Sequence, residues 1–200
     1  MESHSEDSMM KLIFASNNTN KLKEIKALVP PHIQVLSLQD IQFDIEIEET
    51  GNTLQENAAI KARRIFELTG EACFADDSGL MVDALDGQPG VKSARYAGEP
   101  SDNLANIQLL LKNLQNTEDR NARFQTVVCY KNAEQEHFFK GEVLGHITNE
   151  MHGNNGFGYD PIFIPIGYTK TFAEMAAEEK NKISHRKNAI AQLVAFLNQI

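Results

Sequence analysis

The chain has 200 residues, with 42% hydrophobic and 24% charged side chains, as in ordinary globular proteins that bury a sizeable core. Its formal net charge of -9 argues against general binding to nucleic acid or to membrane surfaces, because proteins that bind such polyanions present basic faces. An anionic ligand would therefore need a local basic cluster or a metal ion.

The two cysteines, Cys73 and Cys129, lie far apart inside apolar segments, which predicts buried thiols in a reducing compartment rather than a disulfide. No apolar run is long enough to cross a bilayer, and the polar, acidic residues 1–8 do not resemble a secretory signal. We therefore expect a cytoplasmic protein, with residues 1–8 as a disordered extension or a cloning remnant and residues 9–200 as a single domain.

The first part of the chain predicts a strand, a polar loop and a helix. Residues 11–15 indicate a buried strand, and Leu22, Ile25 and Leu28 recur at helical spacing until Pro30 ends the helix. The loop between strand and helix consists of Ser16, Asn17, Asn18, Thr19, Asn20 and Lys21. Its N–H groups and the helix start would suit a phosphate, with Lys21 as a point charge. A plain helix cap is the alternative.

An acidic segment follows a predicted strand at residues 34–38. In residues 44–49, Glu46 and Glu48 alternate with isoleucines and so share one face of an extended strand, whereas Glu49 breaks the alternation. A charge run of this kind is usually a solvated face, but a glutamate at the end of a strand could reach a ligand site.

The next segment carries the signals of a capped helix. Residues 53–56 form a capping-box pattern, and Gly70 closes the helix after Thr69. Asn57 and Lys61 lie four residues apart and hence on one face of this helix. An asparagine there is usually neutral surface, whereas the lysine could reach a phosphate.

Residues 74–80 combine a short strand with two adjacent carboxylates. Residues 72–75 suit a buried strand, although so short a run does not exclude a buried helical turn. Asp76 and Asp77 are poor strand-interior residues, so we expect the strand to stop there and present a carboxylate where open α/β sheets bind ligands. Adjacent carboxylates repel unless a cation or donors lie between them, which indicates a metal site or acid/base chemistry. A polar turn is the alternative.

The middle of the chain predicts a turn, a loop, a helix and a hairpin, none of which indicates a ligand site by itself. A turn at residues 87–90 leads into a loop at residues 93–96, and residues 123–130 and 136–140 indicate a hairpin followed by a further extended piece at residues 141–148. Between them, a helix is predicted whose core-facing stripe consists of Leu104, Ile107, Leu110, Leu111 and Leu114.

Residues 153–161 are rich in glycine and precede a predicted strand at residues 162–164. The glycines let the backbone approach a flat ligand closely, while Phe157 or Tyr159 supplies a stacking face. A glycine-rich turn is the alternative.

The last helix begins in a basic cluster. Ser184 is a predicted N-cap, which places His185 and Arg186 at the helix start. Positive charge at the positive end of a helix dipole is unfavourable unless an anion or an acceptor-rich ligand binds there. The alternative is a solvated basic turn.

Together these segments describe a site for a magnesium-bound polyphosphate that carries a flat base. The relevant motifs are Ser16-Asn17-Asn18-Thr19-Asn20-Lys21, Glu49-Thr50-Gly51, Glu56-Asn57-Ala58 with Lys61, Ala75-Asp76-Asp77-Ser78-Gly79-Leu80, Pro89-Gly90 with Ser93-Ala94-Arg95-Tyr96, Gly156-Phe157-Gly158-Tyr159-Asp160-Pro161 and Ser184-His185-Arg186. In these motifs and their order, from residue 11 to the C-terminus, the sequence resembles the inosine triphosphate pyrophosphatase family, which hydrolyses deaminated purine triphosphates (ITP, dITP, XTP). It departs from that family at the first loop, where many members have Thr-Gly-Asn.

The resemblance implies an elongated α/β fold with a long mixed β-sheet flanked by helices, two lobes with a central cleft, and usually a homodimer. It also implies Mg²⁺-dependent attack of water on the α-phosphorus, which yields the nucleoside monophosphate and pyrophosphate. Asp77 would be the catalytic base and a metal ligand, and Glu49 a further metal ligand. Substrate contacts would come from Ser16, Asn17, Asn18, Thr19, Asn20, Lys21, Lys61, Ser78, Phe157, Gly158, Tyr159, Asp160, Lys180, His185 and Arg186.

Base selectivity follows from hydrogen bonding. Hypoxanthine and xanthine carry a keto oxygen where adenine carries an amino group, so donors from His185, Arg186 or nearby backbone would be left unpaired against adenine. Guanine also has this keto group, so another feature must reject its 2-amino group.

Three other hypotheses are a Maf-type pyrophosphatase that prefers pyrimidine or modified nucleotides, a regulatory protein that binds a triphosphate without cleaving it, and a structural oligomer.

Overall fold

The protein is built around a mixed six-stranded sheet. The computed structural model describes residues 9–200, so the extension expected at residues 1–8 lies outside the described residues. The strands are β1 (Met10–Phe14), β2 (Ile33–Leu36), β3 (Cys73–Val82), β4 (Asn121–Lys131), β5 (Glu136–Ile147) and β6 (Phe163–Pro165), in the order β2-β1-β3-β4-β5-β6. β1 runs parallel to β2 and β3, whereas β3 to β6 are antiparallel neighbours.

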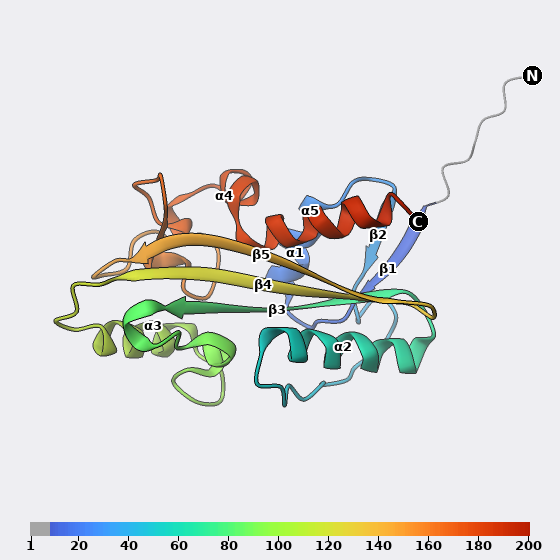
Figure 1. The fold of residues 1–200 in the computed structure, drawn as a ribbon, viewed down its shortest axis with the longest axis horizontal. Helices are drawn as coiled ribbons and strands as arrows, with labels where there is room; N and C mark the ends of the chain where they lie inside the picture. The colour runs from blue at the N-terminus through green and yellow to red at the C-terminus, as the bar shows by residue number, and fades with distance from the viewer. Residues whose placement is uncertain (1–8) are drawn as a thin grey trace, which may run out of the picture.

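Helices cover both faces of the sheet. In Figure 1, α4 (Ala177–Ile183) and α5 (His185–Leu197) lie above the long strands, and α2 (Leu54–Thr69) and α3 (Asn103–Asn113) lie below them. The helix α1 (Thr19–Leu28) packs against α4 and α5. Short 3₁₀ helices complete the chain: η1 (Asp83–Leu85), η2 (Gly90–Arg95), η3 (Asp160–Ile162) and η4 (Phe172–Glu174). Among the described residues, no helix is long and apolar enough to cross a membrane.

The long strands β3, β4 and β5 connect two halves of an elongated molecule (Figure 1). β1 pairs with β3 only at Cys73 and Phe74, whereas β6 pairs with the opposite end of the sheet, near Ile147 of β5. Beyond Phe74, therefore, β3 leaves its parallel neighbour β1 and runs on alone beside β4. This opening in the sheet is where α1, α2 and α5 bring their polar side chains.

Three apolar clusters stabilise this arrangement. In the half that contains β6, one cluster gathers around Phe163. In the other half, Phe14 and Ile190 belong to a cluster between the sheet and α1 and α5, and Ala62 and Cys129 belong to a cluster between the sheet and α2. The two cysteines are buried free thiols, as predicted.

The predicted end of the third strand at Asp76 is wrong, because β3 continues through Asp76 and Asp77 to Val82. Both aspartates pair with β4, opposite Val128 and Val127. The low strand propensity of aspartate is overridden here because donors from three helices satisfy the two carboxylates, which point to opposite faces of the strand.

Several other boundaries also differ from the predictions. Residues 44–49 alternate between exposed and half-buried, but they form no strand in the sheet. Residues 93–96, predicted as loop, lie largely within the 3₁₀ helix η2. Leu104, expected in the core, is 50% exposed, because the buried stripe of α3 begins only at Asn106 and Ile107.

The predicted extended piece at residues 141–148 is not separate, because β5 runs unbroken through Gly141. A β-carbon at Gly141 would lie 1.9 Å from the His185 carbonyl oxygen. Glycine at this position therefore allows α5 to pack closely against β5, and it does not interrupt the strand.

The predicted helix caps are confirmed, except that the Glu56 side chain accepts from the Asn52 N–H and not from the Thr53 N–H that a capping box requires. Thr53 caps α2 by accepting the Glu56 N–H, and Gly70 ends that helix in the left-handed conformation. Ser184 caps α5 by accepting the Lys187 N–H. These signals are local, which explains why the sequence alone reveals them.

Candidate active site

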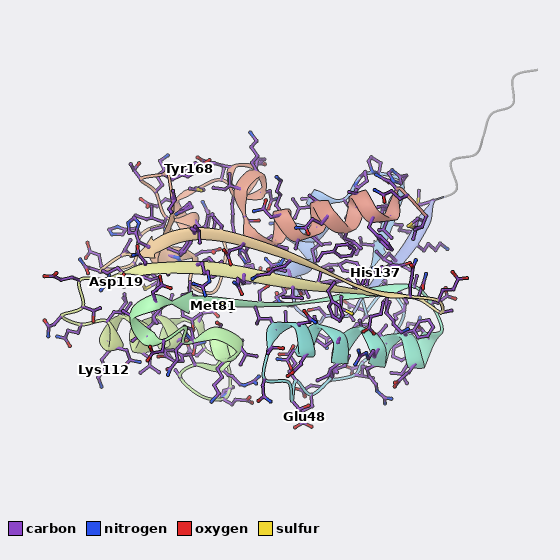
Figure 2. The ribbon with its side chains drawn as sticks, viewed as in Figure 1. Glu48, Met81, Lys112, Asp119, His137 and Tyr168 are labelled. Atoms are coloured by element: carbon purple, nitrogen blue, oxygen red, sulfur yellow. The ribbon has the colours of Figure 1, made fainter. Side chains whose placement is uncertain are left out.

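A single cleft of about 820 Å³ gathers nearly all the residues singled out from the sequence. It is lined by Ser16, Asn17, Asn18, Asn20, Lys21, Glu49, Lys61, Asp77, Ser78, Phe157, Gly158, Tyr159, Asp160, Lys180, His185 and Arg186. Thr19 is not among the lining residues, because it begins α1 behind its cap Asn18. Figure 2 labels Glu48, which lies on the segment that borders the cleft on the α2 side.

Asp77 is held by neutral donors. Its Oδ2 accepts from the Asn57 side-chain amide at 3.1 Å, and its Oδ1 accepts from the Ser78 backbone N–H at 3.0 Å. Burial raises the pKa of Asp77 above its ordinary value, and the nearby Glu49 carboxylate adds to this effect, which Lys61 and Lys21 oppose. A carboxylate that lacks a direct cationic partner is suited to accept a proton or to bind a metal ion.

Asp76, on the opposite face of β3, has the contrary environment. Its Oδ1 accepts from Lys21 Nζ at 3.1 Å, and its Oδ2 accepts from Arg186 Nε at 3.2 Å and from Ser78 Oγ at 3.2 Å. Burial alone would raise the pKa of Asp76, but the Lys21 and Arg186 cations hold it well below its ordinary value. Asp76 is therefore a fixed anion that holds two cations at the edge of the cleft.

The two lysines of the phosphate side differ in their surroundings. Lys61 Nζ lies 2.5 Å from Glu49 Oε1, and although burial would lower its pKa, the carboxylates of Asp77, Asp76 and Glu49 keep it above its ordinary value. Burial lowers the pKa of Lys21, and neighbouring Lys61 adds to this effect, while Asp76 opposes it.

The other end of the cleft contains a second ionic cluster. Lys180 Nζ donates to Glu24 Oε1 at 2.6 Å and to Asp160 Oδ2 at 2.7 Å, and Arg186 also donates to Glu24. Lys180 Nζ and Arg186 Cζ lie 5.1 Å and 5.7 Å from the centre of the Phe157 ring. The Phe157 ring is therefore held beside cations while part of it stays exposed.

Tyr159 and His185 form the buried walls of this end. The Tyr159 hydroxyl donates to the Ser93 carbonyl at 2.7 Å, and its side chain belongs to an apolar core cluster, which leaves Phe157 as the accessible aromatic face. The His185 ring stacks on Phe124 with centroids 4.7 Å apart, and its buried Nδ1 has no hydrogen-bond partner among residues 9–200. Burial lowers the pKa of His185 well below its ordinary value, and Arg186 reinforces this, so the ring is neutral near pH 7.

The start of α5 is consequently not a solvated basic turn. Arg186 is 1% exposed, and its guanidinium is shared among Asp76, Glu24 and Ser78. Of its five N–H groups, two are not engaged by any contact within residues 9–200.

Sequence reasoning missed several residues that hold the site together. Glu24 lies three positions after Lys21 on α1, and this spacing was a signal that the two share a face. Asn57 was recognised on the face of Lys61 but interpreted as surface, whereas it is fully buried. No signal pointed to Phe124 or Thr126, because their positions depend on the pairing of β4 with β3.

The donor set of the cleft fits a magnesium ion. The cleft is lined by six acidic side chains (Glu46, Glu48, Glu49, Asp77, Glu99, Asp160) and by five basic ones (Lys21, Lys61, Arg95, Lys180, Arg186). Because its charge does not favour a polyanion, an added cation would be needed. Residues 9–200 contain no cluster of three or more His, Cys, Asp or Glu side chains arranged to hold a metal. Glu49 and Asp77 alone suit Mg²⁺, which binds through one or two carboxylates, substrate phosphates and retained waters.

Comparisons with known proteins agree over nearly the whole chain. The model of the Ham1 family matches residues 12–196. The dITP/XTP pyrophosphatase of Christiangramia forsetii is 50% identical over 190 residues, which cover 95% of this chain and 100% of that protein. The solved structure of the Staphylococcus aureus Ham1 protein has a TM-score of 0.86 at 43% identity, and covers 94% of this chain and 98% of its own. A HAM1 protein from Coxiella burnetii has a TM-score of 0.87 at 39% identity, and covers 96% and 100%.

Proposed function

Because the chain belongs to the Ham1 family, we propose that it is a Mg²⁺-dependent pyrophosphohydrolase that converts ITP, dITP and XTP to the monophosphate and pyrophosphate. The family match confirms the resemblance drawn from the motifs, and the related structures confirm the elongated two-lobed α/β fold. The reaction would remove deaminated purines from the nucleotide pool. The observation that carries the proposal is one cleft with Asp77, Glu49, Lys21 and Lys61 at one end and an accessible Phe157 ring at the other.

The phosphate end supplies charge and a base. Lys21 and Lys61 offer ammonium groups to the phosphate oxygens, and the loop before α1 offers N–H groups at a helix start. Asp77 would accept the proton of the water that attacks the α-phosphorus, while pyrophosphate leaves from the opposite side. Its burial and its neutral partners make it a stronger base than the tightly paired Asp76.

Glu49 and Asp77 would hold Mg²⁺, which when bound neutralises charge on the phosphate oxygens and polarises the phosphorus. In the present structure the Lys61 ammonium forms an ion pair with the Glu49 carboxylate. Once Glu49 binds a cation, this ammonium would be free to turn toward a phosphate. Ser78 lies between the two ends, with its hydroxyl bound to Asp76, Thr126 and Arg186.

The base end would recognise the purine. Phe157 would offer a stacking face, and His185 and the two remaining N–H groups of Arg186 would read the 6-keto oxygen. Adenine would leave such donors unpaired, which is costly in a buried site. A homodimer and a cytoplasmic location stay predictions from the resemblance.

The proposal is tested by pyrophosphate release from ITP, dITP, XTP, GTP, ATP, dUTP and dTTP with Mg²⁺ at mildly alkaline pH. We expect turnover of the deaminated purines, loss of activity with a chelator, and a drop of about 10²- to 10⁴-fold in Asp77→Asn, because the substitution removes a general base. Asp83→Asn, an exposed aspartate of η1, is the matched control and should retain activity.

Two results would contradict the proposal. Preferred turnover of pyrimidine nucleotides would indicate a Maf-type enzyme, and tight binding without pyrophosphate release would indicate a binding protein. Full activity of a folded Asp77→Asn variant would leave the pyrophosphatase proposal intact but would remove Asp77 as the base.

A further inference from the structure

Asn57 connects the two carboxylates proposed to work together. It lies near the start of α2 and is fully buried. Its Oδ1 accepts the Gly51 backbone N–H at 2.8 Å, and its Nδ2 donates to Asp77 Oδ2 at 3.1 Å. One planar amide thus joins the loop that follows Glu49 to the strand that carries Asp77.

The close fit around this amide fixes its orientation. A β-carbon at Gly51 would lie 2.6 Å from Asn57 Oδ1 and 2.7 Å from the Glu56 β-carbon, so only glycine lets the backbone come this near. Because the Gly51 N–H can pair only with the oxygen of the amide, the NH₂ group must face Asp77.

The bond to Asp77 in turn restricts the carboxylate. Oδ1 is engaged by the Ser78 N–H and Oδ2 by Asn57, so both oxygens have a fixed neutral donor. Rotation of the carboxylate would break both bonds. A general base must hold its accepting oxygen close to the attacking water, and a misplacement of about 1 Å can cost about 10²-fold in rate.

We propose that Asn57 is a positioning residue that sets the orientation of Asp77 and its separation from Glu49, an inference that rests on the proposed function. The competing explanation is that Asn57 only stabilises the start of α2 by satisfying buried polar groups. The two explanations differ in what they predict for turnover in a variant that remains folded.

Three variants separate the two bonds. Asn57→Leu removes both, Asn57→Asp keeps an acceptor for the Gly51 N–H but puts a second carboxyl group where the amide donates to Asp77, and Gly51→Ala displaces the amide from the other side. The matched control is Asn106→Leu in α3, a buried asparagine that likewise bridges two groups, the Ala97 N–H and the Ala94 carbonyl.

The measurements are kcat and KM for dITP with Mg²⁺, melting temperature, and the rise in melting temperature with Mg²⁺ and a non-hydrolysable α,β-imido analogue of dITP. We expect kcat to fall about 10²-fold in Asn57→Leu and Asn57→Asp while KM and the analogue-induced shift stay near wild type. Gly51→Ala should reduce kcat in the same manner. Asn106→Leu should lower the melting temperature comparably and keep kcat within about twofold, measured well below its melting temperature.

A kcat within about threefold of wild type in folded Asn57→Leu or Asn57→Asp would overturn the inference and leave a structural role. If Asn57→Leu does not fold, Asn57→Asp and Gly51→Ala decide the question. A wild-type protein that releases no pyrophosphate from any deaminated purine triphosphate would instead refute the proposed function, and this inference with it.

Discussion

At the scale of single residues, the two adjacent aspartates of β3 have opposite roles. Asp76 accepts from Lys21 and Arg186 and has no exposed surface, whereas Asp77 lines the cleft and, within residues 9–200, accepts only from neutral groups. The alternation of side chains along a strand produces this difference, because it directs one carboxylate toward α1 and α5 and the other toward α2. Asp76 therefore acts as an internal counter-ion for cations from both ends of the cleft.

Asp76→Asn should therefore destabilise the protein by about 3 kcal/mol, because it leaves the buried Arg186 and the half-buried Lys21 with one fewer counter-ion. The free energy of unfolding from urea titration measures this effect. Asp83→Asn, which breaks an exposed ion pair with Arg123, should change it by less than about 1 kcal/mol. Equal small effects in both variants would show that the Asp76 cluster contributes little to stability.

At the scale of elements, the sequence predicted what local signals determine. The ends of α2 and α5 were predicted from their capping residues Thr53, Gly70 and Ser184. The prediction failed where tertiary partners override local preference. β3 continues through Asp76 because helices far away in the sequence supply its donors, and β5 continues through Gly141 because α5 packs there.

Gly141→Ala tests the close packing of α5 on β5. The added methyl group would meet the His185 carbonyl oxygen at 1.9 Å and the Ala189 backbone nitrogen at 2.5 Å. Because both are backbone atoms, the whole helix start must shift, and we expect a loss of about 3 kcal/mol in the free energy of unfolding, at the upper end of what overpacking usually costs. Because α5 carries His185 and Arg186, KM for the nucleotide should rise as well.

Lys140→Ala, at the preceding residue, is the control for Gly141→Ala. Its side chain is 59% exposed, so its removal should change stability by no more than about 0.5 kcal/mol. Urea titration and steady-state kinetics on both variants provide the comparison. A Gly141→Ala protein with unchanged stability and KM would show that α5 can move away from the sheet at no cost.

At the scale of the whole molecule, the cleft is assembled from segments that only the sheet topology brings together. Motif order predicted that Lys21, Glu49, Asp77, Phe157 and Arg186 share one site, and they do line one cleft. The residues that support them were not predictable in this manner. Phe124 stacks on His185 only because β4 pairs with β3 and α5 crosses β5, and neither contact has a local signature in the sequence.

Burial of His185 at the start of α5 should make the stability of the protein sensitive to mild acid. Burial and the cations Arg186, Lys180 and Lys21 lower the pKa of His185, and Asp76 opposes them only in part. The unfolded chain takes up a proton near the ordinary histidine pKa of about 6.5, whereas the folded protein does not. The contribution of His185 to stability is therefore complete above this pH and is lost as the pH falls below it.

The free energy of unfolding should consequently fall by about 1.4 kcal/mol per pH unit below about pH 6.5 through this group alone. The side chain in His185→Gln cannot take up a proton. Between about pH 7.5 and pH 5.5, the free energy of unfolding of this variant should therefore fall by about 1.4 kcal/mol less than that of the wild type, as measured by urea titration at each pH. His152→Gln, at a side chain that is 44% exposed, is the control for exchanging a histidine for glutamine. Parallel losses of stability in wild type and His185→Gln would mean that the ring is already protonated in the fold, and the base end of the cleft would then carry one more positive charge.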